Sequence, residues 1–443
     1  MSRPSIWMLV SESAGHYVET DSAQWVLYGS NVKTIARRID SDSRFETIIR
    51  LLSAQPGEHS LIGVDTDHDP TVHAYRGIAS SFDVYYCKRP SDGTMIVGDH
   101  FRNVLSELSV DERIVPESVA GDHLLFGTRP RDTYVEAIDR LGHGESLTWP
   151  VDSEPNTELV ETLSATERIT PSEAKRRLDT HFADRLSTAA FDGPVATMLS
   201  GGVDSTLLHS YLDTDVSVSA AFDSPEFANE VAYAERASEV LGSDHELVAF
   251  DERTFRDRVE ATTLATGHPL QHLQTTLVHA AIAETDHRSY VNGEFADSIF
   301  GTGNAALAYL ARYTGRLTAV LPNVVSEIGE LKRTARQLHY PATHPSGLAM
   351  GFSTHADENR IANVLGKDAV QERKNGRLRY IRDRISIGST ARYADHMHLG
   401  HCIVFCKKIR RHYGDRPLTL PVRNSLPPSP IEKCSKLRLQ SPP

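Results

Sequence analysis

The sequence predicts an α/β protein in two parts: a C-terminal part with a doubly wound parallel sheet and an N-terminal α+β part rich in antiparallel strands. From residue 170 onward, strand and helix patterns alternate, which is typical of a sheet with parallel strands. The preceding part, up to about residue 150, contains short β-branched and aromatic runs bounded by turn residues, which are typical of antiparallel strands. The length of 443 residues favours the same division, because it exceeds what one hydrophobic core usually organises.

Composition and charge indicate a soluble globular protein. Hydrophobic residues make up 40% of the chain and charged residues 24%. The formal net charge of -12 argues against a nucleic-acid partner, and no apolar run is long enough to span a membrane. The N-terminus lacks the features of a secretory signal, and the four cysteines are too few and too scattered for a disulfide framework. We therefore expect a cytoplasmic protein without a nucleic-acid or membrane partner, and the sequence is compatible with a homodimer.

The N-terminal part is predicted to end near the acidic, polar stretch that follows residue 150. Its strands are predicted at 6–10, 24–28, 82–87, 94–98 and 141–149, and its helical candidates at 35–50 and 101–108. The turn residues of 89–93 predict a hairpin between the third and fourth of these strands. We place the first domain at residues 1–155, a linker at 156–169 and the second domain at 170–443.

The second domain begins at a helix with a capping start, Thr170-Pro171-Ser172-Glu173. Apolar residues then recur every fourth position, which predicts one buried helix face. Strands are predicted at 195–199, 216–222 and 246–250, and further helices at 230–241, 276–284, 358–365 and 378–385. Ligands of such sheets bind at the carboxyl ends of the strands.

One of those strand ends carries the segment Ser200-Gly201-Gly202-Val203-Asp204-Ser205, which precedes a helical pattern. Glycines let a backbone approach an anion closely, and the first-turn N–H groups of a helix point toward it. An acidic residue beside a bare phosphate is unfavourable, so Asp204 predicts a Mg²⁺ ion between the two. The plain structural alternative is a glycine turn that only joins a strand to a helix.

A second segment, residues 290–301, combines a strand end, a glycine turn and two carboxylates. Glu294 and Asp297 are three residues apart and share one side of a predicted helix start. Two such carboxylates are unfavourable unless cations or protons compensate them. Pairing them with Asp204 would complete a magnesium and pyrophosphate site. The alternative is a helix N-terminus whose acidic residues only complement the helix dipole.

Both segments resemble motifs of a known family. The segment from Ser200 to Ser205 is similar to the SGGxDS pyrophosphate loop (PP-loop) of ATP pyrophosphatases, and it lacks the Lys-Ser or Lys-Thr pair of a Walker loop. The second segment resembles the asparagine synthetase motif sGeGaDElFgGY, with departures at Asn292, Phe295 and Ser298. The chain therefore resembles the asparagine synthetase family, and the second domain would have the adenine nucleotide alpha hydrolase-like fold.

The resemblance implies ATP and Mg²⁺ as cofactors and a role for each matching residue. Glu294 would act as general base for the attacking amine, and Asp204 and Asp297 would bind metal. A late lysine, Lys433 or alternatively Lys436, would stabilise the adenylation transition state. ATP and pyrophosphate would be bound by Leu199, Ser200, Gly201, Gly202, Asp204, Ser205, Phe222 and Gly293.

The N-terminal part resembles the glutaminase domain of that family, an Ntn-hydrolase-like domain. The family's nucleophile is an N-terminal cysteine, whereas this chain has Ser2 and lacks the family's Cys-Gly-Ile start. Glutamine hydrolysis in the family depends on a thiolate. We therefore expect a degenerate domain without glutaminase activity, with any residual nucleophilic role of Ser2 left open.

The function implied is ATP-dependent amide formation. A small carboxylate such as aspartate would become an acyl-adenylate with release of pyrophosphate, and ammonia or another amine would capture it. Glutamate at position 294, where β-lactam-forming relatives have tyrosine, favours a simple amide product. Two alternatives stay open: a specialised amide, lactam or peptide-cyclising synthetase, and a catalytically inactive nucleotide-binding scaffold. A sulfur-transferring tRNA enzyme is disfavoured by the missing cysteine pair and basic surface.

Overall fold

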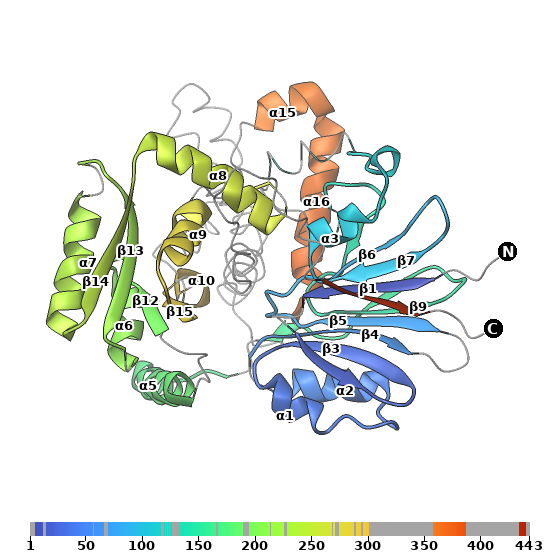
Figure 1. Ribbon diagram of the computed structural model, residues 1–443, viewed down its shortest axis with the longest axis horizontal. Coiled ribbons are helices and arrows are strands. Elements are labelled where there is room, and N and C mark those ends of the chain that lie inside the picture. Colours follow the sequence, from blue (N-terminus) through green and yellow to red (C-terminus); the bar gives the residue numbers. More distant parts are fainter. Residues whose placement is uncertain are drawn as a thin grey trace. The chain divides into compact units, whose positions relative to one another are not determined.

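The computed structural model of the 443-residue chain divides into two compact units (Figure 1). Unit 1 comprises Met1–Ala165 and Thr302–Pro443, and unit 2 comprises Thr166–Gly301. The structure describes residues 5–11, 15–55, 57–65, 70–116, 119, 121, 123, 125, 131, 133–164, 167–188, 195–212, 214–225, 228–267, 269–270, 274–287, 289–293, 296–300, 358–386 and 434–439.

Unit 1 contains two large β-sheets. The six-stranded sheet is antiparallel and has the order β10-β9-β5-β4-β3-β2. Its strands are β2 (His16–Glu19), β3 (Ala23–Gly29), β4 (His59–Asp65), β5 (Thr71–Arg76), β9 (Glu145–Pro150) and β10 (Asn156–Leu159). The five-stranded sheet has the order β17-β1-β7-β6-β8, in which β1 and β7 are parallel and the other pairs antiparallel. Its strands are β1 (Ile6–Ser11), β6 (Tyr85–Lys88), β7 (Met95–Gly98), β8 (Asp139–Arg140) and β17 (Cys434–Leu439).

The two sheets face each other across an apolar core, and helices cover their outer faces. Val26 and Tyr28 of β3 contribute to the core between the sheets, while Trp25 and Leu27 pack toward α1 (Val32–Ala36) and α2 (Phe45–Ser53). This alternation is the period-2 pattern of a strand. On the other sheet, helix α3 (Phe101–Ser106) packs against β6 and β7. Figure 1 shows the resulting order helix, sheet, sheet, helix.

Most predicted elements of unit 1 are confirmed, including the hairpin of β6 and β7. The helix predicted over 35–50 is wrong, because two short helices, α1 and α2, flank a turn there. The predicted linker also contains strands: β10 pairs with β9, and β11 (Leu163–Ser164) lies further along. Their sequences are polar and exposed, so backbone pairing rather than an apolar pattern defines them.

Besides β17, three later elements belong to unit 1: α15 (Glu358–Leu365), α16 (Lys367–Asp383) and β16 (Ile385–Ser386). Helix α15 has the predicted bounds, whereas α16 begins well before the helix predicted over 378–385. The first half of α16 is polar, which hides it from a search for apolar spacing. Strand β16 pairs in parallel with β11 and forms a separate two-stranded sheet.

Unit 2 is organised around a four-stranded parallel sheet, as predicted. The strand order is β14-β13-β12-β15, with β12 (Val195–Met198), β13 (Val216–Phe222), β14 (Asp244–Phe250) and β15 (Ser289–Asn292). The helices of this unit are α5 (Pro171–Thr188), α6 (Val203–Tyr211), α7 (Ala228–Leu241), α8 (Glu252–Thr266), α9 (Gln274–Glu284) and α10 (Ala296–Phe300).

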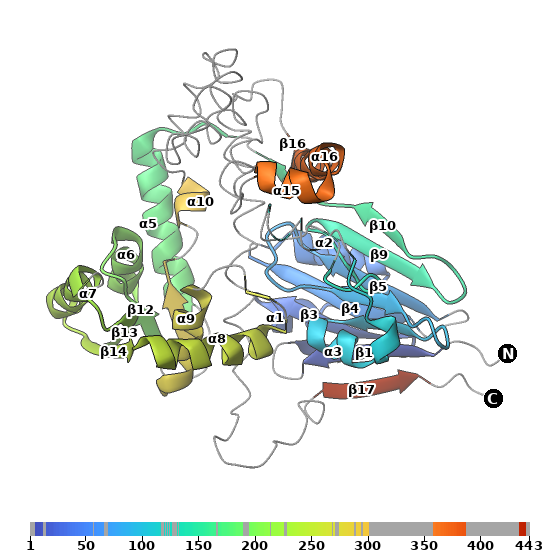
Figure 2. The ribbon, with the colours of Figure 1, turned by 90° about the horizontal axis from the view of Figure 1, so that it is seen from above.

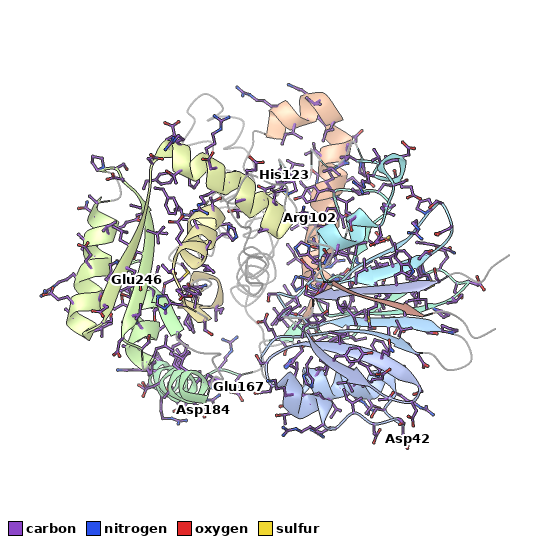
Figure 3. The ribbon with its side chains drawn as sticks, in the orientation of Figure 1. Asp42, Arg102, His123, Glu167, Asp184 and Glu246 are labelled. Atoms are coloured by element: carbon purple, nitrogen blue, oxygen red, sulfur yellow. The ribbon has the colours of Figure 1, made fainter. Side chains whose placement is uncertain are left out.

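Helices lie on both faces of this sheet (Figures 1 and 2). Ala196 of β12 packs toward α9, and the neighbouring Thr197 contacts α6, because successive residues of a strand point to opposite faces. Helix α5 packs on α6 and carries charged side chains at its surface. Glu167 pairs with Arg177 at 2.6 Å, and Asp184 is exposed on the same helix (Figure 3).

Among the residues that the structure describes, no helix is both long enough and apolar enough to cross a membrane.

Candidate functional site

The predicted binding segments lie at the carboxyl ends of two neighbouring strands. The loop 199–202 follows β12, and Gly293 follows β15, which is the parallel neighbour of β12. The chain continues from β12 to β13 on one side, while β15 lies on the other side. Connections therefore diverge between β12 and β15. In open α/β sheets, such a point is where a crevice outside the strand ends binds ligands.

Gly201 gives the loop a conformation that other residues do not readily adopt. Its φ is +71°, in the left-handed region. A Cβ at this position would lie 2.5 Å from Cβ of Tyr233 and 2.6 Å from the backbone N of Ala234. Both the positive φ and the lack of room for a Cβ beside α7 therefore require glycine at this position. The loop packs closely against α7.

Hydrogen bonds between two serines close the loop. Ser205 is buried, and its Oγ lies 3.1 Å from Oγ of Ser200 and accepts a 3.2 Å hydrogen bond from the Ser200 N–H. The Ser205 hydroxyl also lies 3.3 Å from the carbonyl oxygen of Gly202. Leu199, also buried, ties the loop to β13, because its N–H donates to Val218 and its carbonyl accepts from the Ser219 hydroxyl.

Gly293 contacts the first turn of α6. A Cβ at Gly293 would lie 2.6 Å from the backbone N of Ser205 and 3.0 Å from the carbonyl carbon of Asp204. The structure thus brings together the two segments that the sequence separates by almost a hundred residues. Any side chain at Gly293 would displace the helix start, so this close approach needs glycine.

The start of α6 has features suited to an anion with a cation. Gly202 is its N-cap residue, and no described side chain caps the helix there, so the first-turn N–H groups are available to a ligand. Asp204 is exposed in this first turn. A Cβ at Gly202 would contact only the Ser200 hydroxyl, at 3.3 Å, so the loop presents open backbone. Such a donor set suits a phosphate group whose Mg²⁺ is held by a carboxylate.

The loop rests on a chain of buried polar groups that the sequence did not indicate. Below α6, His209 lies with Nδ1 2.8 Å from Oγ1 of Thr197 and Nε2 2.8 Å from Oγ of Ser243. His209 follows Ser205 by four residues and so shares its helix face. This spacing of four residues is the one feature of the sequence that indicates a place for His209 below the loop. A hydroxyl residue in a strand, such as Thr197, would ordinarily be predicted to be exposed.

The contacts continue across the sheet. The Ser243 hydroxyl lies 2.9 Å from that of Ser238, which lies 3.2 Å from that of Ser217. The Ser217 hydroxyl is also 2.9 Å from Nδ1 of His245. We call the six residues Thr197, His209, Ser243, Ser238, Ser217 and His245 the hydroxyl–imidazole network. Because it joins β12, β13, β14, α6 and α7, it fixes the helix that carries the loop.

Burial sets the protonation of both imidazoles in this network. Desolvation lowers the pKa of His209, and the neighbouring His245 lowers it further. Desolvation also lowers the pKa of His245, and Glu235 opposes this. Both histidines are therefore neutral at physiological pH. A neutral imidazole has one donor and one acceptor nitrogen, and both nitrogens of His209 have partners in the network.

The remaining predicted site residues are placed as follows. Phe222 ends β13 and packs its ring against Phe255 of α8, with centroids 4.7 Å apart. Asp297 is the second residue of α10, directly after the β15 turn. Lys436 belongs to β17 in unit 1, where it is paired with Leu9. Glu294, Lys433 and Ser2 lie outside the described residues.

No cluster of three or more His, Cys, Asp or Glu side chains at metal-binding distance occurs in the part of the chain that the structure describes. The roles of these residues stay predictions.

Comparison with known proteins identifies the family. A family model described as Asparagine synthase matches residues 174–397, just over half of the chain. Amidase chry2 of Gibberella zeae is 30% identical over 172 residues, which cover 34% of this chain and 25% of that protein. This chain therefore spans about a quarter of the length of that relative. The family match contains the loop, Gly293 and the parallel sheet, and the chain belongs to the asparagine synthase family.

Proposed function

We propose that this protein is an ATP-dependent ligase that forms amides through an acyl-adenylate. The observation that supports this most directly is the meeting of the Ser200–Ser205 loop with Gly293 at the diverging strand ends of unit 2. The open backbone of the loop and the uncapped start of α6 suit a pyrophosphate group. Membership of the asparagine synthase family supports the reaction class.

The loop residues bind the departing pyrophosphate in this proposal. Backbone N–H groups of the loop after Ser200 and of the first turn of α6 donate to its oxygens, and Leu199 and Gly293 hold the loop and the helix start in place. Asp204 and Asp297 would hold Mg²⁺, which supplies positive charge to the phosphate oxygens. Phe222 would lie beside the adenine. These groups stabilise charge that develops when a substrate carboxylate attacks the α-phosphorus.

Glu294 and a late lysine would serve the two chemical steps. Glu294 would accept the proton of the amine that attacks the acyl-adenylate. Lys433, or Lys436 in its place, would stabilise the negative charge of the adenylation transition state. AMP would then leave with the carboxylate oxygen, and the new C–N bond would complete the amide.

Aspartate and free ammonia are the simplest substrate pair, and the protein would act in the cytoplasm without a nucleic-acid or membrane partner. Unit 1 has two sheets between helical layers, an order that supports a relation to Ntn-hydrolase-like glutaminase domains. With Ser2 in place of the family's cysteine, unit 1 would not release ammonia from glutamine.

A second candidate is a specialised member of the same superfamily. The similar protein of Gibberella zeae carries the name amidase. A specialised amide, lactam or cyclic peptide as the product would fit the same loop and the same adenylating step. A nucleotide-binding scaffold without activity is the remaining alternative.

The test is pyrophosphate release from Mg-ATP by the full chain. Aspartate is offered with ammonium and then with glutamine, and other carboxylates follow. We expect release with ammonium and not with glutamine. The Asp204→Ala variant should lower the rate by about 10²–10³-fold, because a charge that acts on the transition state is lost. Asp257→Ala, which removes an exposed carboxylate of α8, is the matched control.

The outcomes separate the alternatives. Release that needs another carboxylate would identify a specialised synthetase, and release with glutamine would refute the inactive glutaminase. Mg-ATP binding without release under any condition would favour the scaffold. Glu294→Gln should abolish amide formation and keep ATP binding, so an unchanged rate would exclude the proposed base.

A further inference from the structure

A buried carboxylate in unit 1 holds the end of helix α16. Glu145, at the start of β9, is 1% exposed. Its Oε2 accepts a 2.9 Å hydrogen bond from the Gly142 N–H, and its Oε1 accepts from Nε of Arg131 at 3.0 Å and from the Arg384 guanidinium. Arg131 is half exposed at its side chain, whereas Arg384 is buried. A carboxylate buried this deeply needs such partners.

Arg384 makes further contacts on both sides of Glu145. Its Nε donates to the carbonyl of His143 at 2.7 Å, and its Nη1 donates to the carbonyl of Tyr380 at 3.1 Å. The guanidinium lies 3.5 Å from the centre of the Tyr380 ring, and the Tyr380 hydroxyl accepts from the His143 N–H at 3.0 Å. The planar fork of arginine makes these contacts simultaneously, which a lysine cannot do.

The end of α16 also binds the segment that leads from unit 1 to unit 2. The N–H of Leu163 in β11 donates to the carbonyl of Arg384 at 2.8 Å, and β11 pairs with β16. Just before β11, one oxygen of Glu161 accepts from the Tyr75 hydroxyl and from the Ile78 N–H, each at 2.7 Å. The chain passes into unit 2 directly after residue 165. The outgoing segment is therefore tied to the end of α16.

The return segment is held by an apolar contact. The chain re-enters unit 1 at Thr302 and reaches α15 at Glu358. Ile361 of α15 and Val370 of α16 are buried in one cluster with Leu125 of the N-terminal part. Residues 174–397 match the synthase family, so α15 and α16 belong to the matched region although they pack in unit 1.

We propose that Glu145 and Arg384 form an anchor by which the N-terminal part holds α16 and β16, and that the synthase reaction depends on this anchor. Arg384 is a positioning residue in this inference, which rests on the amide-forming activity proposed above for its second half. The N-terminal part would thus keep a role in the reaction without glutaminase chemistry, as the support of a segment of the synthase region.

The experiment compares Arg384→Gln with Arg131→Gln in the full chain. Both variants remove one arginine from the same carboxylate, but only Arg384 belongs to the α16 segment. Amide hydrogen exchange reports release of α16, and pyrophosphate release from Mg-ATP reports the reaction. We expect Arg384→Gln to speed exchange in α16 on the order of 10-fold or more and to lower kcat by a similar factor, with KM for Mg-ATP within about 2-fold of wild type.

Arg131→Gln should stay within about 2-fold of wild type in both measurements, because an exposed partner contributes little. Arg384→Lys keeps the charge and loses the fork, so it should restore part of both losses. If Arg384→Gln does not fold, Arg384→Lys is compared with Arg131→Gln in its place.

Three outcomes would overturn the inference. Equal exchange of α16 in Arg384→Gln and wild type would show that Arg384 is no anchor. Faster exchange with an unchanged kcat would leave the anchor a purely structural contact. Equal losses in Arg131→Gln and Arg384→Gln would assign the effect to the carboxylate rather than to α16. If the wild type releases no pyrophosphate with any carboxylate, the proposed function fails, and with it the dependence of the reaction on the anchor. Hydrogen exchange in α16 still tests whether the anchor exists.

Discussion

The two units bury different kinds of side chains. The core of unit 1 contains large apolar residues, among them Trp149, Tyr28 and Met8, and a buried ion pair between Arg76 and Asp83 at 2.7 Å. On the α9 face of the unit 2 sheet, most of the buried residues are small, namely Ala196, Val218, Val248, Ala280 and Ala281, and the larger side chains around them, except Phe250, are only partly buried. Its other face carries the hydroxyl–imidazole network.

This difference indicates what stabilises each unit. Burial of apolar area does not depend on protonation, and large apolar side chains fill the core of unit 1. Hydroxyls and imidazoles contribute only while each has its partner and the imidazoles stay neutral. Small residues also let backbones approach, as at Gly201 and Gly293. In unit 2, a polar network supports a closely packed loop. We therefore expect the stability of unit 2 to depend on hydrogen-bond partners and histidine protonation, and that of unit 1 on apolar packing.

The largest effect is expected from a truncation in the core of unit 1. Trp149 is 2% exposed, packs edge-on against Tyr86 and donates to the Ser153 carbonyl at 2.9 Å. Trp149→Ala should lower the free energy of unfolding by about 3–5 kcal/mol, because it leaves a large cavity. Urea unfolding measures the loss, with the exposed Leu159→Ala of β10 as control. Mg-ATP affinity should not change, and a large change would contradict the division between the units.

A smaller effect is expected at the network of unit 2. His209→Leu removes the partner of both Thr197 and Ser243 and should cost about 1–3 kcal/mol. Because α6 loses its link to β12, Mg-ATP binding should weaken as well, in contrast to Trp149→Ala. Urea unfolding and a nucleotide titration test both effects. The control is His181→Leu, at an exposed position of α5. Equal results for the two histidines would contradict a supporting role of the network.

The smallest effect is expected from pH. Burial lowers the pKa of His209, His245 and His279 below the ordinary value of 6.5. The unfolded chain therefore binds more protons than the native one below about pH 6.5, so stability is complete above that pH and falls as the pH decreases through it. Each group contributes no more than about 1.4 kcal/mol at about pH 5.5.

Urea unfolding between about pH 7.5 and pH 5.5 measures this dependence. The slope should decrease in His209→Leu, because one of the titrating groups is gone. Burial also lowers the pKa of His73 and His123 in unit 1, so the comparison with that variant, and not the slope alone, assigns the effect to unit 2. An unchanged slope in His209→Leu would contradict the assignment.

The elements that the sequence predicted well are those with an apolar pattern or a glycine turn. The strands of unit 2 and the loop at Ser200 carry both signals. Strands β10, β11 and β16 and the first half of α16 have polar, partly exposed sequences, and pairing with distant segments defines them. Tertiary pairing of this kind leaves no local pattern.

Within the site, the sequence predicted which residues belong to the loop but not what supports them. Gly293 was expected near ATP, and the structure adds that it contacts the backbone of Ser205. No polar motif in the neighbouring sequence indicated the role of His209, because its partners Thr197 and Ser243 come from a strand and a distant turn. The buried pairing of Glu145 with Arg384 joins residues 239 apart and was equally hidden.

The discontinuity of unit 1 has a consequence for the order of folding during synthesis. Unit 2 is inserted between residues 165 and 302. A ribosome therefore makes every strand of the two large sheets except β17, then all of unit 2, and only afterwards α15, α16 and β17. Unit 2 has every described strand of its sheet before Arg384 is made. Until Arg384 is made, the carboxylate of Glu145 is therefore either paired with Arg131 or solvated. Unit 2 can therefore finish folding before unit 1, whose sequence lies on both sides of it in the chain.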